Sequence, residues 1–277
     1  GRIAVTGFRV GELLEQPNLG SVSCEAGLNG VVGKGLIDAR VDGSVSQLEF
    51  NGYDYDSLRF GGRLTEKTFN GHVRADDPAL RFDFQGEVGF NPERPHYDFD
   101  LDLIHADLAR MHLNRRDSVS VLSALVEARA SGRTLDDLNG KVTVGDVVYR
   151  YNADTLRTTR LTLDGQNSAG SKYLSLQSEF ADATFRSRTD YKTVFEYLRS
   201  SLEKYIPLLY DEQKARKRAA GAVSVVDDYS VLSVDVKHFT PVADAVADGL
   251  QIADGSQLRL LFNPANDKLS LKATSEY

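Results

Sequence analysis

Apolar and polar residues alternate with a period of two along most of the chain. Between Tyr97 and Leu103, four apolar side chains alternate with three aspartates. The same alternation occurs in residues 80–85, 122–131, 147–151, 258–262 and 269–273. Because successive side chains of a strand point to opposite faces, each stretch is predicted to be a strand with one apolar and one wet face. The predicted fold class is therefore all-β.

Some local features are open to more than one interpretation. Residues 118–130 are rich in Ala, Leu and Glu, which favour helices, but their alternation favours a strand. At Asn51-Gly52 the apolar phase shifts by one residue, which predicts a β-bulge. Turn residues predict chain reversals at Asp56-Ser57, Asp76-Asp77-Pro78, Asp164-Gly165, Asp254-Gly255 and Asn263-Pro264.

Helices are predicted to be few and short. Asp190 is suited to cap a helix over Tyr191–Ile206, whose apolar residues fall on one face. Together with the charged residues that follow, this helix forms a predicted helical excursion over residues 190–221. Shorter helices are predicted over Gly11–Asn18, Asp211–Ala220 and Pro241–Leu250.

One long strand pattern occurs twice, about a hundred residues apart. The first copy consists of Gly43, Tyr53, Tyr55, Leu58, Phe60 and Gly62, and the second of Gly140, Tyr149, Tyr151, Leu161, Leu163 and Gly165. The second copy is predicted to lack the bulge of the first. A period of this length predicts an elongated protein of repeated units, approximately 1–117, 118–225 and an incomplete 226–277.

The apolar faces of so many strands have to be covered. In a closed sandwich or a filled β-helix they pack against each other, which is how most alternating strands are used. In the other arrangement, a single long sheet curls into a trough with the apolar side chains inside. Alternation is the same in both arrangements, so it does not separate them.

Composition and charge limit the function classes. The 277 residues carry a net charge of −7, which argues against a general nucleic-acid binder. Cys24 is the single cysteine, so an intramolecular disulfide is excluded, and we expect it to be a buried filler. No secretory signal and no apolar run long enough to cross a bilayer is present. Because the sequence begins and ends beside predicted strands, we expect it to be a fragment of a longer protein.

Candidate catalytic and metal motifs are weak. The stretch Gly30–Gly35 resembles a phosphate-binding loop, but it lacks the Walker spacing and the Ser or Thr that would hold Mg²⁺. His96, His105 and His112 lie near three aspartates without a recognised metal spacing. We therefore predict no enzyme activity, catalytic residue, metal or cofactor. An enzyme on a β-helix scaffold is the third alternative, and it would need close carboxylates with perturbed pKa values.

A single basic cluster follows the long predicted helix. Its members are Lys214, Arg216, Lys217 and Arg218. Such a cluster is usually a solvated helix face, but it is also suited to contact anionic lipid headgroups or an acidic partner.

Several short phrases, in their order along the chain, carry a family resemblance. They are Gly52–Tyr55, Leu135–Val142, Phe180–Phe185 followed by Tyr191–Ile206, and Gly249–Ser256 followed by Phe262-Asn263. With these phrases, nearly the whole chain resembles the TamB branch of the AsmA-like family, in the form found in Bacteroidota. The resemblance implies a curled antiparallel sheet that forms a U-shaped β-groove with an apolar interior and a few short helices.

The resemblance also implies a function. The parent would be an envelope protein anchored in the inner membrane, with this portion in the periplasm. Its non-enzymatic groove would carry phospholipid between the two membranes or assist outer-membrane protein assembly, with assembly partners bound by other parts of the parent. The alternative is a structural or adhesive β-solenoid that binds protein or glycan on its outer surface. The predicted groove lining is Tyr53, Tyr55, Phe60, Leu80, Phe82, Phe84, Phe99, Leu101, Leu103, Val147, Tyr149, Tyr151, Leu161, Leu163, Leu174, Leu176, Leu258, Leu260 and Phe262.

Overall fold

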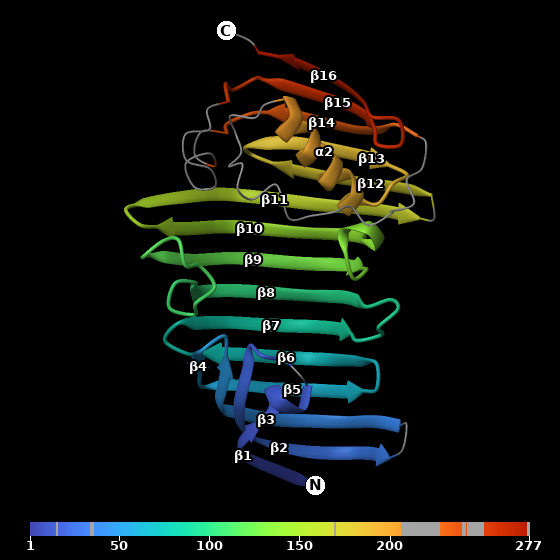
Figure 1. Cartoon of the computed structure of the whole chain (residues 1–277). Helices are drawn as coiled ribbons and strands as arrows, with labels where there is room; N and C mark the ends of the chain where they lie inside the picture. Colours follow the sequence, from blue (N-terminus) through green and yellow to red (C-terminus); the bar gives the residue numbers. More distant parts are fainter. Residues whose placement is uncertain are drawn as a thin grey trace.

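The chain forms one antiparallel sheet of sixteen strands (Figure 1). The computed structural model describes residues 1–14, 16–33, 36–168, 170–205, 228–239, 242 and 252–275. Strands that follow each other in sequence pair with each other in the sheet, except that the short β4 pairs only with β3 and lies off the main path. The predicted all-β class, the antiparallel sheet and the small number of helices are confirmed.

The sheet elements cover most of the described residues. The strands are β1 (Arg2–Arg9), β2 (Leu19–Gly33), β3 (Leu36–Phe50), β4 (Tyr53–Tyr55), β5 (Leu58–Thr65), β6 (Thr68–Asp76), β7 (Leu80–Gly89), β8 (His96–Asp107), β9 (Ser120–Ser131), β10 (Asn139–Tyr151), β11 (Asp154–Ser168), β12 (Ser171–Ser178), β13 (Ala181–Ser187), β14 (Ser230–Val236), β15 (Gln257–Asn263) and β16 (Lys268–Thr274). The helices are α1 (Val10–Leu14), the 3₁₀ turn η1 (Leu135–Asp137) and α2 (Tyr191–Tyr205).

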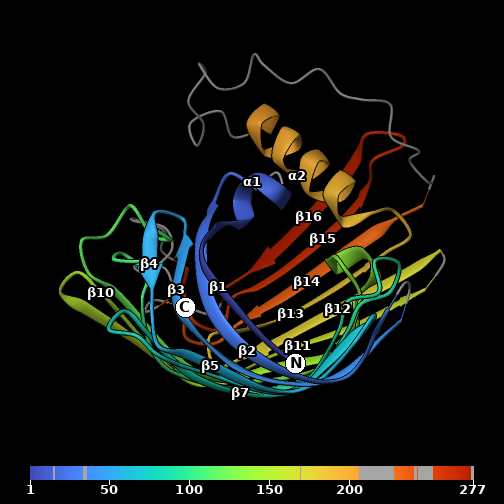
Figure 2. The ribbon, with the colours of Figure 1, turned by 90° about the horizontal axis from the view of Figure 1, so that it is seen from below.

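The sheet is a single open layer, neither closed nor strongly curled, so the curled U shape that the resemblance implies is not shown. Viewed from below it is bowed, and both α-helices lie on the side toward which it bends (Figure 2). Within the described ranges no second sheet covers either face. The closed sandwich and the filled β-helix are therefore not the architecture of this part of the chain.

The ambiguous segment 118–130 is a strand, as its alternation predicts. It forms β9 and pairs with β8 on one side and β10 on the other. A central position in the sheet favours the extended form, because both edges of the strand gain backbone hydrogen bonds. The helix propensity of Ala, Leu and Glu is therefore overridden by tertiary pairing.

The predicted bulge at Asn51-Gly52 is wrong. Both residues have positive φ, 54° and 75°, and they form the two-residue turn between β3 and β4, with Phe50 opposite Tyr53. Asn-Gly favours such a turn because each central position needs positive φ. A register shift occurs instead in the second copy, between Gly145 and Val148, beside Asp146 at φ 46°.

The predicted turn at Asp164-Gly165 is also wrong, because both residues lie inside β11. Gly165 stands opposite Gly140 and Leu174. A side chain at Gly165 would start 2.6 Å from the backbone oxygen of Leu138. The glycine therefore permits close approach of the chain at η1 rather than a reversal.

Gly86 is a second position where the backbone requires glycine. Its φ is 145°, and an added Cβ would lie 2.3 Å from the Asp98 oxygen on β8. We expect Gly86→Ala to lower the free energy of unfolding by about 1–3 kcal/mol, because strained backbone and steric overlap act together. Urea denaturation measures this, with Gly27→Ala as control, since its Cβ would meet nothing closer than 3.7 Å. Equal effects at both positions would refute the steric explanation.

The predicted helices, basic cluster and repeat boundary have different outcomes. The helix predicted over Tyr191–Ile206 is confirmed as α2, and the one predicted over Gly11–Asn18 appears as the shorter α1. The helix predicted at Asp211–Ala220, most of that at Pro241–Leu250, and the basic cluster Lys214–Arg218 lie outside the described residues. The predicted repeat boundary after residue 117 falls between β8 and β9, which pair directly, so the sheet continues across it. None of the helices in the described ranges is long and apolar enough to cross a membrane.

Candidate functional site

An unbroken row of residues, each without a polar side chain and three of them glycines, crosses the sheet from β3 to β16. We call it the central row, and the side of the sheet that carries it the apolar face. Each member stands opposite the next across the strand pairs: Val41, Gly62, Gly71, Gly86, Phe99, Ala128, Val142, Leu163, Leu176, Ala183, Val234, Leu258 and Ala273. Because neighbouring strands lie about 4.8 Å apart, this row is roughly 57 Å long.

Parallel rows widen the apolar face on both sides of the central row. One consists of Phe60, Val73, Phe84, Leu101, Val126, Val144 and Leu161, each opposite the next. All seven are partly buried, so each is covered by its neighbours but still accessible. Where the rows meet, the rings of Phe84 and Phe99 lie 5.1 Å apart. The surface is aliphatic and aromatic, without converging polar groups.

The opposite face of the sheet is polar and crossed by ion pairs. Arg129 on β9 lies 2.9 Å from a carboxylate oxygen of both Asp98 and Asp100 on β8. Similar cross-strand pairs join Arg74 to Asp83 and Arg63 to Asp38. The three aspartates of residues 97–103 are exposed while the apolar residues between them are partly buried, as the alternation predicts.

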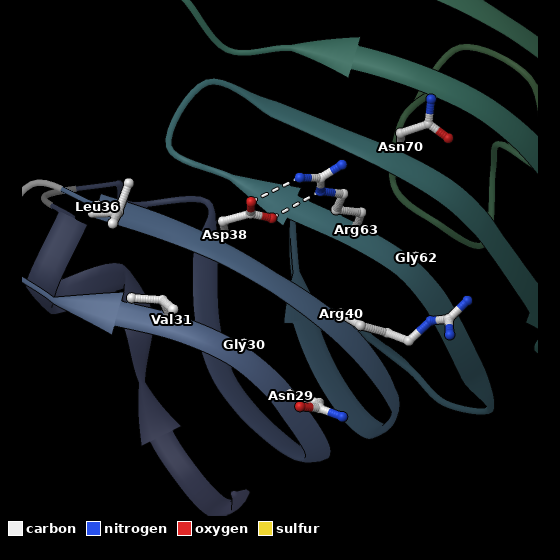
Figure 3. A pocket seen from close by; sticks show the side chains of 9 residues that line it. All are labelled: Asn29, Gly30, Val31, Leu36, Asp38, Arg40, Gly62, Arg63 and Asn70. Atoms are coloured by element: carbon white, nitrogen blue, oxygen red, sulfur yellow. Dashed lines mark hydrogen bonds and ion pairs between the residues drawn. The ribbon is translucent and has the colours of Figure 1, made fainter.

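A hollow of about 760 Å³ lies on this polar face near the β2–β3 hairpin (Figure 3). Arg63 donates two hydrogen bonds to the Asp38 carboxylate, at 2.8 and 2.7 Å, so these two charges compensate each other. Asn29, Arg40 and Asn70 also line it. Its lining combines these polar side chains with the exposed Val31 and Leu36, and it lies on the face opposite the apolar face, so it does not extend that face.

A cluster of buried residues covers the apolar face at the β4 end of the strands. We call it the tyrosine cluster; its buried members are Tyr55, Ala79, Ala106 and Met111. The Asp77 carboxylate, 1% exposed, holds it together by accepting hydrogen bonds from the Tyr53 hydroxyl at 2.9 Å and from the Asp56 and Ala79 amides at 3.1 and 2.7 Å. Burial, together with this bond to Asp77, raises the pKa of Tyr53.

A second buried carboxylate stands at the same end of the sheet. Asp117 accepts hydrogen bonds from the side-chain amides of Asn114, at 2.9 Å, and Asn152, at 3.0 Å. The Asn114 bond contributes most to holding the pKa of Asp117 below its ordinary value. The Tyr149 hydroxyl joins this network through Ser120, at 3.0 Å. The end of β10 is therefore fixed by polar contacts, which sequence periodicity does not reveal.

A third group covers the apolar face near the C-terminal strands. We call it the helix cluster; its buried members are Phe185, Tyr191, Val194 and Phe262. Tyr191 and Val194 come from α2, while Phe185 and Phe262 come from β13 and β15. The helix therefore lies directly on the apolar face.

The predicted groove residues fall into three groups on this face. The first group lies outside the tyrosine cluster and the helix cluster, and all its members are partly buried: Phe60, Phe82, Phe84, Phe99, Leu101, Leu161, Leu163, Leu176 and Leu258. Tyr53, Tyr55, Leu80 and Leu103 belong to the tyrosine cluster, and Val147, Tyr149 and Tyr151 lie near it on β10. Leu174, Leu260 and Phe262 belong to the helix cluster. Tyr55, Tyr151 and Phe262 are buried by the protein itself, at 8% exposure or less.

Sequence reasoning missed Asp77 and Asp117 as structural centres. Their only sequence signals are a turn-forming Asp-Pro and an Asn and Asp three residues apart, and both are common in exposed loops.

Every carboxyl group with a shifted pKa in the described ranges has a pKa below its ordinary value. Side-chain hydrogen bonds are the chief cause for Glu87 and Glu179, whereas for Asp137 hydrogen bonds from backbone amides outweigh the opposite effect of burial. No group of three or more potential metal ligands occurs in the part of the chain that is described.

Comparison with protein-family models, with curated proteins and with solved structures finds no match.

Tyr191 provides a spectroscopic probe of α2 on the apolar face. Burial raises its pKa from an ordinary value of 10.0 to about 12. A raised tyrosine pKa means that the folded state favours the neutral ring, so its contribution to stability is complete below pH 10 and is lost as pH rises through 12. An alkaline absorbance titration should show a late component, to which Tyr53 and Tyr55 also contribute, and Tyr191→Phe should reduce it by one tyrosine. If that variant leaves the late component unchanged, α2 is not docked as described.

Proposed function

We propose that the apolar face is a non-enzymatic binding surface for acyl chains, and that the bowed sheet works as a groove along which phospholipid moves. The observation that carries this proposal is the central row, which runs from β3 to β16 without a polar side chain. Large apolar patches are rare on soluble proteins and usually mark a binding surface.

Energetics support a chain-like apolar ligand. Each buried CH₂ group contributes roughly 0.8 kcal/mol, so an acyl chain on the apolar face is strongly favoured over one in water. The surface offers no converging hydrogen-bond donors that would fix a ligand at one point. Successive positions along the central row are therefore similar in affinity, which suits movement better than capture.

The resemblance to the TamB branch supports a specific setting. In this proposal the chain is a periplasmic portion of an inner-membrane-anchored envelope protein that carries phospholipid toward the outer membrane. A role in outer-membrane protein assembly, with partners bound by other parts of the parent, stays a prediction. The adhesive alternative would place the partner on the polar face, where Arg63, Arg74 and Arg129 pair with aspartates of neighbouring strands.

Lipid extraction from the purified protein tests the proposal. The protein is made in a Gram-negative host, purified without detergent, extracted with organic solvent and analysed by mass spectrometry. We expect phospholipid in the extract, in excess over that from an unrelated soluble β-protein purified in parallel. A lipid-free protein whose circular dichroism shows an intact sheet would contradict the proposal.

A further inference from the structure

The apolar face continues beneath α2 without a change in character. A row parallel to the central row runs through Leu174, Phe185, Leu232 and Leu260, each opposite the next. These four residues all contact the helix cluster. Among the described residues, the helix cluster has no member or packed neighbour on β5 to β11. The helix therefore covers one stretch of the apolar face, while the rows between the helix cluster and the tyrosine cluster stay accessible.

The side chains that α2 presents to the sheet are apolar and well packed. Val194 is fully buried and Tyr191 is 2% exposed, whereas Phe195 on the same helix is 56% exposed. The Tyr197 ring stacks on Phe262, with 5.9 Å between centroids. On this part of the sheet α2 thus makes the contacts that an acyl chain would make elsewhere.

A polar anchor fixes the first turn of α2. The Tyr191 amide donates a hydrogen bond of 2.7 Å to the Asp136 carboxylate in η1, and the Tyr191 hydroxyl donates one of 3.1 Å to Asn167. Lys172 on β12 lies 3.1 Å from Asp136 and 2.9 Å from Asp190. The polar groups of the anchor lie at the edge of the apolar rows, where Lys172 stands two residues before Leu174 and 5.9 Å from the Tyr191 ring centroid. The anchor can therefore be weakened without removing a side chain of those rows.

We propose that α2 sets the end of the acyl-binding stretch. An acyl chain binds over β5 to β11, and α2 takes its place over β12 to β15. One set of side chains cannot contact both, so helix and ligand compete, and release of α2 opens the covered stretch to ligand. This inference rests on the proposed function and assigns that function to part of the face.

The test uses purified protein and palmitate with a photoreactive diazirine near its methyl end. Crosslinked peptides are mapped by mass spectrometry in the wild type, in Val194→Asp, which places a charge against the sheet, and in Phe195→Asp, which places the same charge on the exposed side. We expect wild type and Phe195→Asp to crosslink within β5 to β11 and, on β12 to β15, at none of the residues beneath α2, which are Leu174, Phe185, Leu232 and Leu260. Val194→Asp should gain crosslinks within β12 to β15 of at least half the β5–β11 yield.

Lys172→Met gives a second, milder release of α2, because it removes both ion pairs of the anchor and leaves the helix unchanged. It should gain crosslinks at the same strands, with a smaller yield than Val194→Asp. If Val194→Asp loses the β5–β11 crosslinks as well, the variant is misfolded and Lys172→Met decides alone.

Two results would overturn the inference and leave the proposed function standing. The first is that wild-type crosslinks are spread equally over β5–β11 and β12–β15. The second is that a folded variant meant to release α2, Val194→Asp or Lys172→Met, gains no crosslinks at β12–β15. Crosslinks on neither stretch, in any variant, would instead contradict the proposed function and this inference together.

Discussion

Leu101→Asp is expected to reduce the phospholipid that co-purifies with the protein at least about tenfold, a loss of about 1.4 kcal/mol in binding. Leu101 stands between Phe84 and Val126 in the row beside the central row. An acyl chain that covers a carboxylate there would strip it of water without supplying a hydrogen bond. Lipid phosphate per mole of purified protein measures the effect.

Leu125→Asp is the matched control for this experiment. Leu125 is the neighbour of Val126 on β9, but it stands opposite Asp102 on the polar face and is 43% exposed. The same charge there should leave the lipid content unchanged. Equal losses in both variants would show a general effect of negative charge, and no loss in either would place the lipid elsewhere.

Replacing Phe262 with alanine is expected to lower the free energy of unfolding by about 3–5 kcal/mol. Phe262 is fully buried beneath α2, and its ring stacks on Phe185 and Tyr197, with centroids 6.3 and 5.9 Å away. Its removal leaves a cavity where the helix meets the sheet. Urea denaturation measures the stability, and the pKa of Tyr191 should move back toward 10.0 as its burial decreases.

Phe90→Ala controls for loss of an aromatic ring. Phe90 is 47% exposed and lies outside both clusters. Surface substitutions of this kind usually change stability by no more than about 0.5 kcal/mol. If Phe262→Ala were as mild as Phe90→Ala, α2 would not depend on this contact with the sheet.

The strands and their apolar sides were predictable because they follow from local alternation. Once the stretch from Tyr97 to Leu103 is extended, its apolar side chains must share one face and its aspartates the other. Strand β8 has this arrangement. Segment 118–130 shows the same logic, since its period of two was the better guide than its helix-forming composition. The helix over Tyr191–Tyr205 was predictable from its apolar stripe and the turn before it.

The errors arose where a local signal has two meanings. Asn-Gly fits both a bulge and a two-residue turn, and the choice depends on which strands pair around it. Asp164-Gly165 reads as a turn, but the Leu138 backbone, distant in sequence, is what requires the glycine. Strand register and the number of layers depend on such long-range contacts, so alternation alone could not choose between a sandwich and a single sheet.

The position of α2 and its cap were beyond sequence reasoning for the same reason. Asp190 directly precedes the helix, as predicted, and its backbone oxygen accepts the Val194 amide at 3.0 Å. Its carboxylate, however, pairs with Lys172, and the Asp136 carboxylate accepts the Tyr191 amide. Asp136 and Tyr191 are 55 residues apart. Apolar residues on one side of a helix predict that it docks, and only the folded sheet determines where.

Photo-crosslinking in the cells that make the full-length protein tests the central claim most directly. Photoreactive residues replace Phe82, Leu101 and Leu163 on the apolar face and, as controls, Asp83, Asp102 and Asp164, which are their neighbours on the polar face. We predict phospholipid crosslinked at all three apolar positions and at none of the controls. Equal lipid yields on the two faces, or none on the apolar face, would contradict the account.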